Sequence, residues 1–375
     1  QKPPLAAVTY SRTLTAIGSV TQPFLTAELC VAVSCWLRRR ARWLCQGGAH
    51  EKGRAMTAWA ELHLHLEGTL EPELIFVLAE RNGIQLPYED LEELRSRYDF
   101  ADLQSFLDLY YTNMQVLQTE QDFADLTDAY LARAQRAGIR RAEVFFDLQA
   151  HTARGVDPKV ALAGVHRALA ASEARYGIST GLILTFLRHL PGTDAMDAYQ
   201  QAVDSGVPLL GVGLCSSEIG FPAVPFAEVF DRARADGLHT VAHAGEEGDA
   251  GYVREALDVL KVERVDHGVH AVDDPRLLER LVAEQMPLTM CPLSNVRLKV
   301  VPTLADHPIV DLLRQGVKVT VNSDDPAYFG GYLDDVVAAL RTEFDLTDAD
   351  IDQLARNSIE ASFAPEAEKA RLLAE

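Results

Sequence analysis

Two histidines, His63 and His65, are the first side chains whose spacing suggests chemistry. In an extended strand, residues two apart point to the same side, so both imidazoles would face one way. Paired imidazoles suit a divalent transition metal. A single histidine on an apolar strand is more often a hydrogen-bonded core residue. A metal site therefore needs support from elsewhere in the chain.

Three later apolar runs supply that support, because each also ends in polar residues. His243 ends one run, His267 ends the next, and Asp324 and Asp325 follow the last. Two adjacent carboxylates packed together without a cation would cost free energy through desolvation and mutual repulsion. The spacing alone predicts a mononuclear metal site with a water completing the coordination. Its four predicted ligands are His63, His65, His243 and Asp324.

Such a site predicts a hydrolase. A bound Zn²⁺ lowers the pKa of its water from about 15.7 to about 7, which supplies hydroxide at neutral pH. Glu246 lies three residues after His243, where it can shuttle a proton, and His267 can orient or deprotonate the attacking water. The predicted catalytic residues are Glu246, His267 and Asp324.

The elements that position these residues are short apolar runs alternating with stretches of helical periodicity, a pattern typical of successive βα units around a parallel sheet. The eight predicted strands cover 61–66, 142–148, 181–187, 209–215, 238–243, 264–267, 287–291 and 317–322. Eight such units predict a (β/α)₈ TIM-like barrel, whose catalytic residues lie at the carboxyl ends of its strands. The stretch 71–136 predicts several helices, inserted after strand 1 and covering the mouth of the barrel.

Charge is distributed unevenly along the 375 residues. Residues 1–55 hold 8 of the 35 Lys and Arg side chains but only 2 of the 55 Asp and Glu, so 27 basic and 53 acidic side chains remain, a net charge of −26. That field disfavours nucleic acid and anionic membranes as partners. Only two cysteines follow residue 55, which gives no disulfide framework and favours a cytoplasmic location. Homo-oligomerisation is left open.

The first 55 residues contain an apolar run followed by arginines, the reverse of the order in a secretory signal. Two interpretations are open: a basic amphipathic piece that contacts a partner, or translated sequence upstream of a start at Met56. We favour the second. We expect residues 1–55 to be a non-catalytic, poorly ordered extension and 56–375 to be the catalytic barrel.

Five motifs in order along the chain carry a family resemblance. They are Glu-Leu-His-Leu-His-Leu-Glu-Gly-Thr at 61–69, His-Ala-Gly-Glu-Glu at 243–247, Asp-His-Gly at 266–268, Cys-Pro-Leu-Ser-Asn at 291–295 and Asn-Ser-Asp-Asp-Pro at 322–326. Together they resemble the adenosine/adenine deaminase family of the metal-dependent amidohydrolases. The resemblance implies one Zn²⁺ on the four predicted ligands and hydrolytic removal of a purine 6-amino group. It also implies that Glu246 protonates ring N1, His267 activates the hydroxide that attacks C6, and Asp325 hydrogen-bonds N7.

The stretch 65–74 looks like the branch that acts on free adenine, since Glu67 stands where the nucleoside branch usually has an Asp that contacts ribose. The resemblance implies a purine-binding set of Asp325, Glu67, Ser217 and Glu218. One departure is Cys215, where the branch usually has Asp. We expect deamination of adenine to hypoxanthine and ammonia. The alternatives are adenosine or another 6-substituted aminopurine, or a silent purine-binding protein, which the intact polar set argues against.

Overall fold

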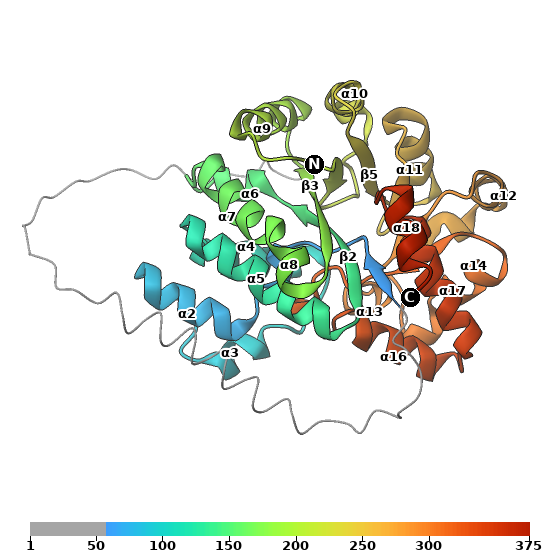
Figure 1. Ribbon diagram of the computed structural model, residues 1–375, viewed down its shortest axis with the longest axis horizontal. Helices are drawn as coiled ribbons and strands as arrows, with labels where there is room; N and C mark the ends of the chain where they lie inside the picture. The colour runs from blue at the N-terminus through green and yellow to red at the C-terminus, as the bar shows by residue number, and fades with distance from the viewer. Residues whose placement is uncertain (1–57) are drawn as a thin grey trace, which may run out of the picture. The chain divides into compact units, whose positions relative to one another are not determined.

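The computed structural model describes residues 58–375. The prediction for residues 1–55 lies outside this range. Eight parallel strands pair in sequence order, each with the next, and helices surround them (Figure 1). The strands are β1 (Trp59–Glu61), β2 (Ile139–Phe146), β3 (Ser179–Leu187), β4 (Gly211–Cys215), β5 (His239–Ala244), β6 (Arg264–His267), β7 (Leu288–Met290) and β8 (Val319–Val321). The predicted (β/α)₈ barrel is confirmed.

The barrel closes through the residues that follow β1 and β8. Leu64 forms a parallel bridge with Asp324; His65 N donates to Asp324 O at 3.0 Å, and Asp324 N donates to His63 O at 3.1 Å. On the other side, Phe145 N donates to Leu64 O at 2.9 Å. The same short segment therefore joins both neighbouring strands and carries the two histidines.

One strand prediction was wrong in extent. The run 61–66 was expected to be a continuous strand, but β1 ends at Glu61 and only isolated bridges continue from it. The reason is that the backbone beyond β1 bonds alternately to the β2 and β8 sides instead of forming one ladder. The two histidines still lie two residues apart in a bridged, extended segment.

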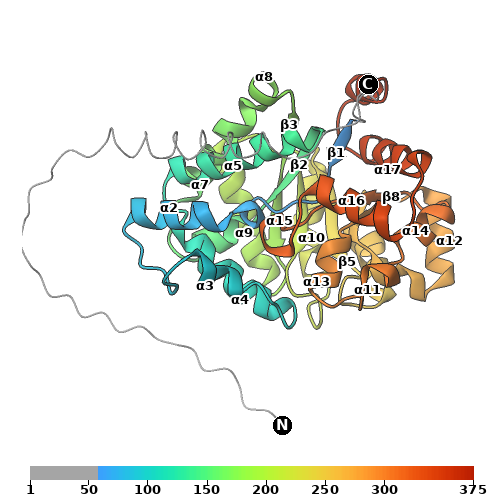
Figure 2. The same ribbon diagram turned by 90° about the horizontal axis from the view of Figure 1, so that it is seen from below.

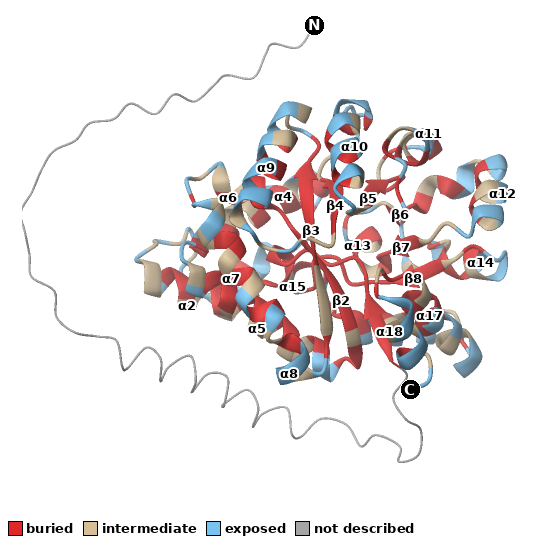
Figure 3. Ribbon diagram, turned by 45° about the horizontal axis from the view of Figure 1, so that its top comes forward, coloured by how far each residue is buried: buried red, intermediate tan, exposed pale blue. Residues whose placement is uncertain are grey.

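The strands are apolar because both faces of the sheet are covered. Figure 3 shows the strands coloured mainly as buried and the outer surfaces of the helices as exposed. The helices that follow successive strands are α7 (Pro158–Ala170), α9 (Gly192–Ser205), α10 (Ala227–Ala235), α11 (Ala250–Glu255), α12 (Pro275–Glu284), α14 (Ile309–Arg314) and α16 (Leu333–Glu343), with α17 (Asp348–Glu360) and α18 (Glu366–Leu372) completing the chain.

Side chains at their first turns explain where several of these helices begin. Asp274 accepts hydrogen bonds from Arg276 N and Leu277 N, and Pro275 occupies the first position of α12. Thr347 and Asp350 form a reciprocal capping box on α17. Such caps satisfy backbone N–H groups that have no partner inside the helix.

The helical insertion lies between β1 and β2, as predicted. It contains α2 (Pro72–Asn82), α3 (Leu91–Ser96), α4 (Leu103–Asn113) and α5 (Glu120–Arg136). Figure 2 shows α2, α3 and α4 together beside the barrel. The apolar face of α4 reaches the carboxyl ends of the strands, where its side chains line a cavity. Over residues 58–375, every helix is too short or too polar to cross a bilayer.

A buried ion cluster occupies the amino-terminal end of the barrel; we call Arg141, Glu143 and Arg264 the floor cluster. Glu143 accepts two hydrogen bonds from Arg141, at 3.0 and 3.1 Å, and one from Arg264 Nη1. Phe363 N donates to the same carboxylate at 2.7 Å. Burial opposes ionisation of Glu143, but the two guanidinium groups outweigh it and lower the pKa of this carboxyl. The Glu143 carboxylate is thus fully bonded by groups that the chain itself supplies.

Candidate metal and active site

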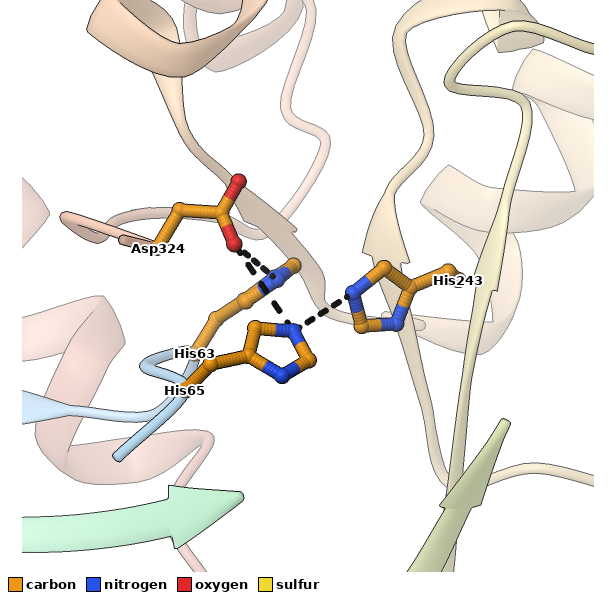
Figure 4. A group of neighbouring side chains, drawn as sticks. All are labelled: His63, His65, His243 and Asp324. Atoms are coloured by element: carbon orange, nitrogen blue, oxygen red, sulfur yellow. Dashed lines mark hydrogen bonds and ion pairs between the residues drawn. The ribbon is translucent and has the colours of Figure 1, made fainter. Parts of the chain in front are cut away.

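The carboxyl ends of three strands bring the four predicted ligands together. His63 and His65 follow β1, His243 lies near the end of β5, and Asp324 follows β8. One ligand atom from each lies within 4.8 Å of the others, and all four residues are buried. Figure 4 shows the three imidazoles and the carboxylate converging on one point. The structure therefore assembles the set expected from the sequence.

The atoms that face the centre of this cluster cannot all form hydrogen bonds with one another. His65 Nε2 lies 3.1 Å from His243 Nε2, and His63 Nε2 lies 3.3 Å from Asp324 Oδ1 (Figure 4). A single proton can serve only one such pair, and among the described residues His63 Nε2 has no hydrogen-bond partner. A divalent cation accepts lone pairs from all four residues at once. The cluster therefore fits a metal ion.

The outward-facing ring nitrogens have acceptors behind them. His63 Nδ1 lies 3.1 Å from Thr289 O, and His243 Nδ1 lies 3.5 Å from Asp266 Oδ2. His65 Nδ1 lies 3.6 Å from Asp147 Oδ1. These contacts favour the tautomers with hydrogen on Nδ1, which leave the Nε2 lone pairs directed toward the centre.

The pKa values show how strongly carboxylates surround this cluster. Burial lowers the pKa of His65, but Asp147, Asp325 and Asp324 outweigh it and raise that pKa to about 10. Burial, reinforced by His63, instead lowers the pKa of His243 to about 4. The carboxylates around His65 thus favour positive charge beside it, while His243 is held neutral, the form in which an imidazole binds a metal ion.

Two of the site residues have left-handed backbone conformations. His267 has φ 63° and Asp324 has φ 64°. Such conformations cost a non-glycine residue roughly 1–3 kcal/mol and persist where the surrounding structure imposes them. Each turn lies at the end of a strand and aims its side chain into the barrel mouth. The chain therefore tolerates a conformational cost at His267 and Asp324, two positions where the side chain must point into the barrel mouth.

Glu246 and His267 lie next to the ligand cluster. His267 Nε2 is 3.4 Å from Glu246 Oε2, and Asn295 Nδ2 contacts His267 Nδ1 at 3.2 Å. Burial, followed by the charge of Asp324, raises the pKa of Glu246 well above its ordinary value. Burial also lowers the pKa of His267 well below its ordinary value. A protonated carboxyl therefore faces a neutral imidazole, a suitable acid and base.

Asp325 is the second protonated carboxyl. Burial and the adjacent Asp324 raise the pKa of Asp325 well above its ordinary value, and within residues 58–375 its Oδ1 has no hydrogen-bond partner. A side chain at Gly68 would overlap Asp325, so glycine is required for their close approach. Asp325 can donate a hydrogen bond into the site.

These groups share a narrow cavity with α4. Its lining combines His65, His243, Glu246, His267, Asp324 and Asp325 with Leu103, Phe106, Leu107, Tyr110 and Tyr111 of the insertion. The cavity is small, with a volume of ≈ 40 Å³. The insertion thus encloses the polar cluster with apolar and aromatic side chains, an arrangement that excludes water and strengthens electrostatic interactions.

The adenosine deaminase family matches residues 59–375, almost the whole described chain. The chain belongs to the adenosine deaminase family. An adenine deaminase of Streptomyces coelicolor is 58% identical over 322 residues, which cover 84% of this chain and 94% of that protein. An adenine deaminase of Cupriavidus necator is 56% identical over 319 residues, 85% of this chain and 91% of that one. The resemblance seen in the motifs is confirmed, including its adenine deaminase branch.

Solved structures agree with this assignment. The crystal structure of an adenine deaminase from Arthrobacter aurescens is 56% identical, with a TM-score of 0.84, and the match covers 84% of this chain and 97% of that one. A more distant amidohydrolase from Burkholderia ambifaria, described with bound Zn, is 25% identical with a TM-score of 0.78, over 87% of this chain and 94% of that one.

One residue of this deaminase site was missed in the sequence. Asp147 follows β2, is buried, and lines the cavity. It accepts hydrogen bonds from Thr185 Oγ1, from Tyr110 Oη at 3.3 Å and from Cys215 Sγ at 3.5 Å. The predicted strand 142–148 had placed Asp147 inside the strand. An acid directly after the apolar run would have been the signal.

Cys215 supplies a thiol where this branch usually has an acid. It is buried, and burial together with Asp147 raises the pKa of its thiol well above the ordinary value. The thiol therefore stays neutral and acts as a weak donor to Asp147.

Three predicted purine-binding residues lie outside the cavity lining. Glu67 lies behind Asp147: its Oε1 accepts from Asp147 N at 3.0 Å and from His151 Nε2 at 2.7 Å. Ser217 is partly exposed, and its neighbour Ser216 lines the cavity instead. Glu218 is buried against backbone N–H groups of the segment after β5. Asp325 alone of the predicted purine-binding set lines the cavity.

Proposed function

We propose that the protein is a zinc-dependent adenine deaminase, which hydrolyses adenine to hypoxanthine and ammonia. The observation that carries the chemistry is the pair of Glu246 and His267, 3.4 Å apart beside a four-residue ligand cluster, with burial raising the pKa of Glu246 and lowering the pKa of His267. The substrate follows from relatives that are adenine deaminases at 58% and 56% identity over most of the chain. The partner is thus a small-molecule purine.

His63, His65, His243 and Asp324 would hold the metal. Three imidazoles and one carboxylate form a donor set that Zn²⁺ prefers, and the Zn-bound amidohydrolase of the same fold supports this choice. Bound Zn²⁺ would supply a water molecule whose pKa is lowered to about 7.

The chain's own residues then handle the protons. Glu246 gives its proton to ring N1, which makes C6 electrophilic. His267 orients the attacking water and takes its proton as the oxygen adds to C6. The C6–N6 bond breaks after His267 returns that proton to the amino group, which leaves as ammonia, while the C6 hydroxyl gives its proton to the Glu246 carboxylate; this forms the C6 carbonyl of hypoxanthine and restores the acid. Asp325, held protonated, donates a hydrogen bond to N7, which is an acceptor in adenine.

The surrounding cavity supports this chemistry. Tyr110, Tyr111 and the leucines of α4 enclose the reacting groups, so the substrate ring would exchange water for apolar contacts.

Both described cysteines, Cys215 and Cys291, are free and buried, as a reducing cytoplasmic compartment requires. The charge of −26 on residues 56–375 supports a small substrate over a polyanion.

Adenosine or another 6-substituted aminopurine is the second candidate. Cys215 favours it, because a thiol lines the cavity at a position where the resemblance implies an acid. A thiol beside Asp147 changes the charge and size of the wall, which can admit a different substituent.

The test is ammonia release from matched adenine, adenosine and N6-methyladenine by zinc-loaded protein beginning at Met56. We expect turnover of adenine, with one zinc per chain by elemental analysis. Preferential turnover of adenosine or N6-methyladenine would support the second candidate. Turnover of none of the three by protein with a full zinc content would contradict deamination.

A further inference from the structure

The carboxylate of Glu218 has four backbone donors, all from one short segment. Glu218 Oε1 accepts from Gly245 N at 2.7 Å. Its Oε2 accepts from the next three N–H groups, those of Glu246, Glu247 and Gly248, at 3.0, 3.0 and 2.8 Å. The residue is 1% exposed. Hydrogen bonds to a carboxylate are charge-assisted and stronger than neutral ones, so this contact fixes the segment after β5.

Gly248, one of two glycines in this segment, fits the contact. A Cβ at Gly248 would lie 2.9 Å from Glu218 Cδ and would also overlap the Tyr252 ring. The backbone approaches the carboxylate closely only because no side chain intervenes. The segment has no strand partner of its own beyond Ala244, so Glu218 replaces the ladder that would otherwise hold it.

Arg188 holds the other end of the same segment. It follows β3, and its Nη1 donates to His243 O at 2.8 Å while its Nε donates to Phe221 O at 2.9 Å. Its guanidinium lies 3.9 Å from Glu218 Oε1. Both side chains are buried. The pair therefore spans from a predicted metal ligand to the segment that carries the predicted acid.

We propose that Glu218 and Arg188 are positioning residues for deamination, which hold segment 243–248 so that His243 and Glu246 keep a fixed separation. The inference rests on the proposed function, since it assigns those two residues their roles. Neither Glu218 nor Arg188 lines the cavity, so neither is placed to contact the purine. Two buried charges are costly to keep, and the four N–H groups that Glu218 binds lie in a run of bends directly after the end of β5.

The segment needs such support because Glu246 has little of its own. The ion-pair contact of its carboxyl is His267 Nε2 at 3.4 Å, longer than a strong hydrogen bond. A shift of about 1 Å in a reacting group can reduce the rate by about 10²-fold. The charge of Glu218 is also among the causes that raise the pKa of Glu246.

Glu218→Gln is the first variant to test. The amide nitrogen accepts no hydrogen bonds, so the variant loses acceptors for one or three of the four N–H groups. We expect kcat for adenine to fall by about 10²-fold with KM changed by less than about threefold. Zinc content should match the parent. Hydrogen exchange of the amides at 245–248 should become faster, a readout that does not depend on activity.

Glu255→Gln is the matched control. Glu255 Oε2 accepts from Ala223 N at 2.9 Å, so the control removes a carboxylate that bonds backbone of the loop after β4 but does not bond segment 243–248. We expect kcat and exchange at 245–248 to match the parent. Arg188→Met removes the donor to His243 O, and we expect faster zinc loss to a chelator, restored in part by Arg188→Lys.

A rise in KM with unchanged kcat in Glu218→Gln would overturn the proposal and return Glu218 to substrate contact. Parent-like exchange at 245–248 with kcat within twofold would overturn it as well. If the parent does not turn over adenine, the proposed function fails, and amide exchange and zinc retention still test the positioning role. If Glu218→Gln fails to fold by circular dichroism, the Arg188 variants carry the test.

Discussion

The barrel has a cluster of buried charges at each end, and the two clusters are balanced differently. On the floor, Glu143 is bonded by Arg141, Arg264 and a backbone N–H, and its pKa is lowered as in a stable ion pair. At the mouth, Glu246 and Asp325 have raised pKa values and lie among other carboxylates. On the floor, both oxygens of Glu143 accept hydrogen bonds from donors within the chain, whereas at the mouth a cation and a substrate would supply partners that the described residues do not.

The difference separates structure from function in one fold. A buried carboxylate whose partners are all supplied by the chain contributes to the folded state. At the mouth, His63 Nε2 and Asp325 Oδ1 are buried without a hydrogen-bond partner among the described residues, which costs stability and fits a site where a cation or a substrate binds. Substitutions at the mouth should therefore reduce activity, and substitutions on the floor should reduce stability.

His63→Ala should have the largest effect, because it removes a predicted ligand from the mouth. We expect loss of bound zinc and of measurable adenine turnover, since metal affinity depends on the full donor set. Elemental analysis of the purified variant measures the first and ammonia release the second. Parent-like zinc content would remove His63 from the ligand set.

Glu246→Gln removes the predicted acid and no ligand. We expect adenine turnover to fall by about 10²–10⁴-fold, the range for loss of a general acid, with zinc content unchanged. Thermal unfolding should show unchanged or higher stability, because a desolvated carboxyl is replaced by an amide. Near-parent turnover would contradict the proton-donor role.

On the floor, Glu143→Gln should reduce stability and leave turnover unchanged, the reverse of what we expect for Glu246→Gln. Removing one partner from a buried ion cluster costs about 3–5 kcal/mol, because the arginines remain buried without their counter-charge. Denaturant unfolding measures this loss, and kcat per folded molecule should match the parent. Glu366→Gln is the control: its side chain is 89% exposed and pairs with Lys369, so we expect a change within about 0.5 kcal/mol.

The pH dependence of kcat should report the raised pKa of Glu246. The donor must be protonated, so turnover is present below that raised pKa and is lost as the pH rises through it, by about tenfold per pH unit. The ionisable groups that contact it or influence its pKa are His267, Asp324, Glu218, Glu247 and Asp325. A pH profile of kcat for the zinc-loaded protein measures this decline. If the residual activity of Glu246→Gln declines over the same pH range, the decline belongs to a group other than Glu246.

The sequence predicted most of the mouth because its residues obey one rule: polar side chains at the ends of apolar runs. His243, His267 and Asp324 follow that rule and come together in the structure. The barrel and its insertion could be predicted because the periodicities of strands and helices are local features of the sequence. The extent of β1 could not be predicted, because the backbone after β1 bonds alternately to two neighbours that are distant in sequence.

The supporting residues were harder to predict, because their partners are remote and mostly backbone. Nothing local to Glu218 indicates that it binds N–H groups 27 to 30 residues later. Nothing local to Glu67 indicates that its carboxylate pairs with His151, 84 residues away. The resemblance suggested substrate contacts for both, whereas the structure places both one layer behind the cavity.

Glu67→Asp should have the smallest effect, measured as the ratio of adenosine to adenine turnover. This variant compares a residue behind the cavity with residues that line it. If Glu67 excluded ribose directly, the shorter side chain would raise adenosine turnover relative to adenine. Because Glu67 is bound to His151 and Asp147 N outside the cavity lining, we expect this ratio to change by less than about threefold. The free energy of unfolding should instead fall by about 1–3 kcal/mol, because buried donors lose their acceptor. Asp147→Asn, on the cavity wall, is the matched comparison and should change KM for adenine. A large rise in relative adenosine turnover in Glu67→Asp alone would restore its role in excluding the sugar.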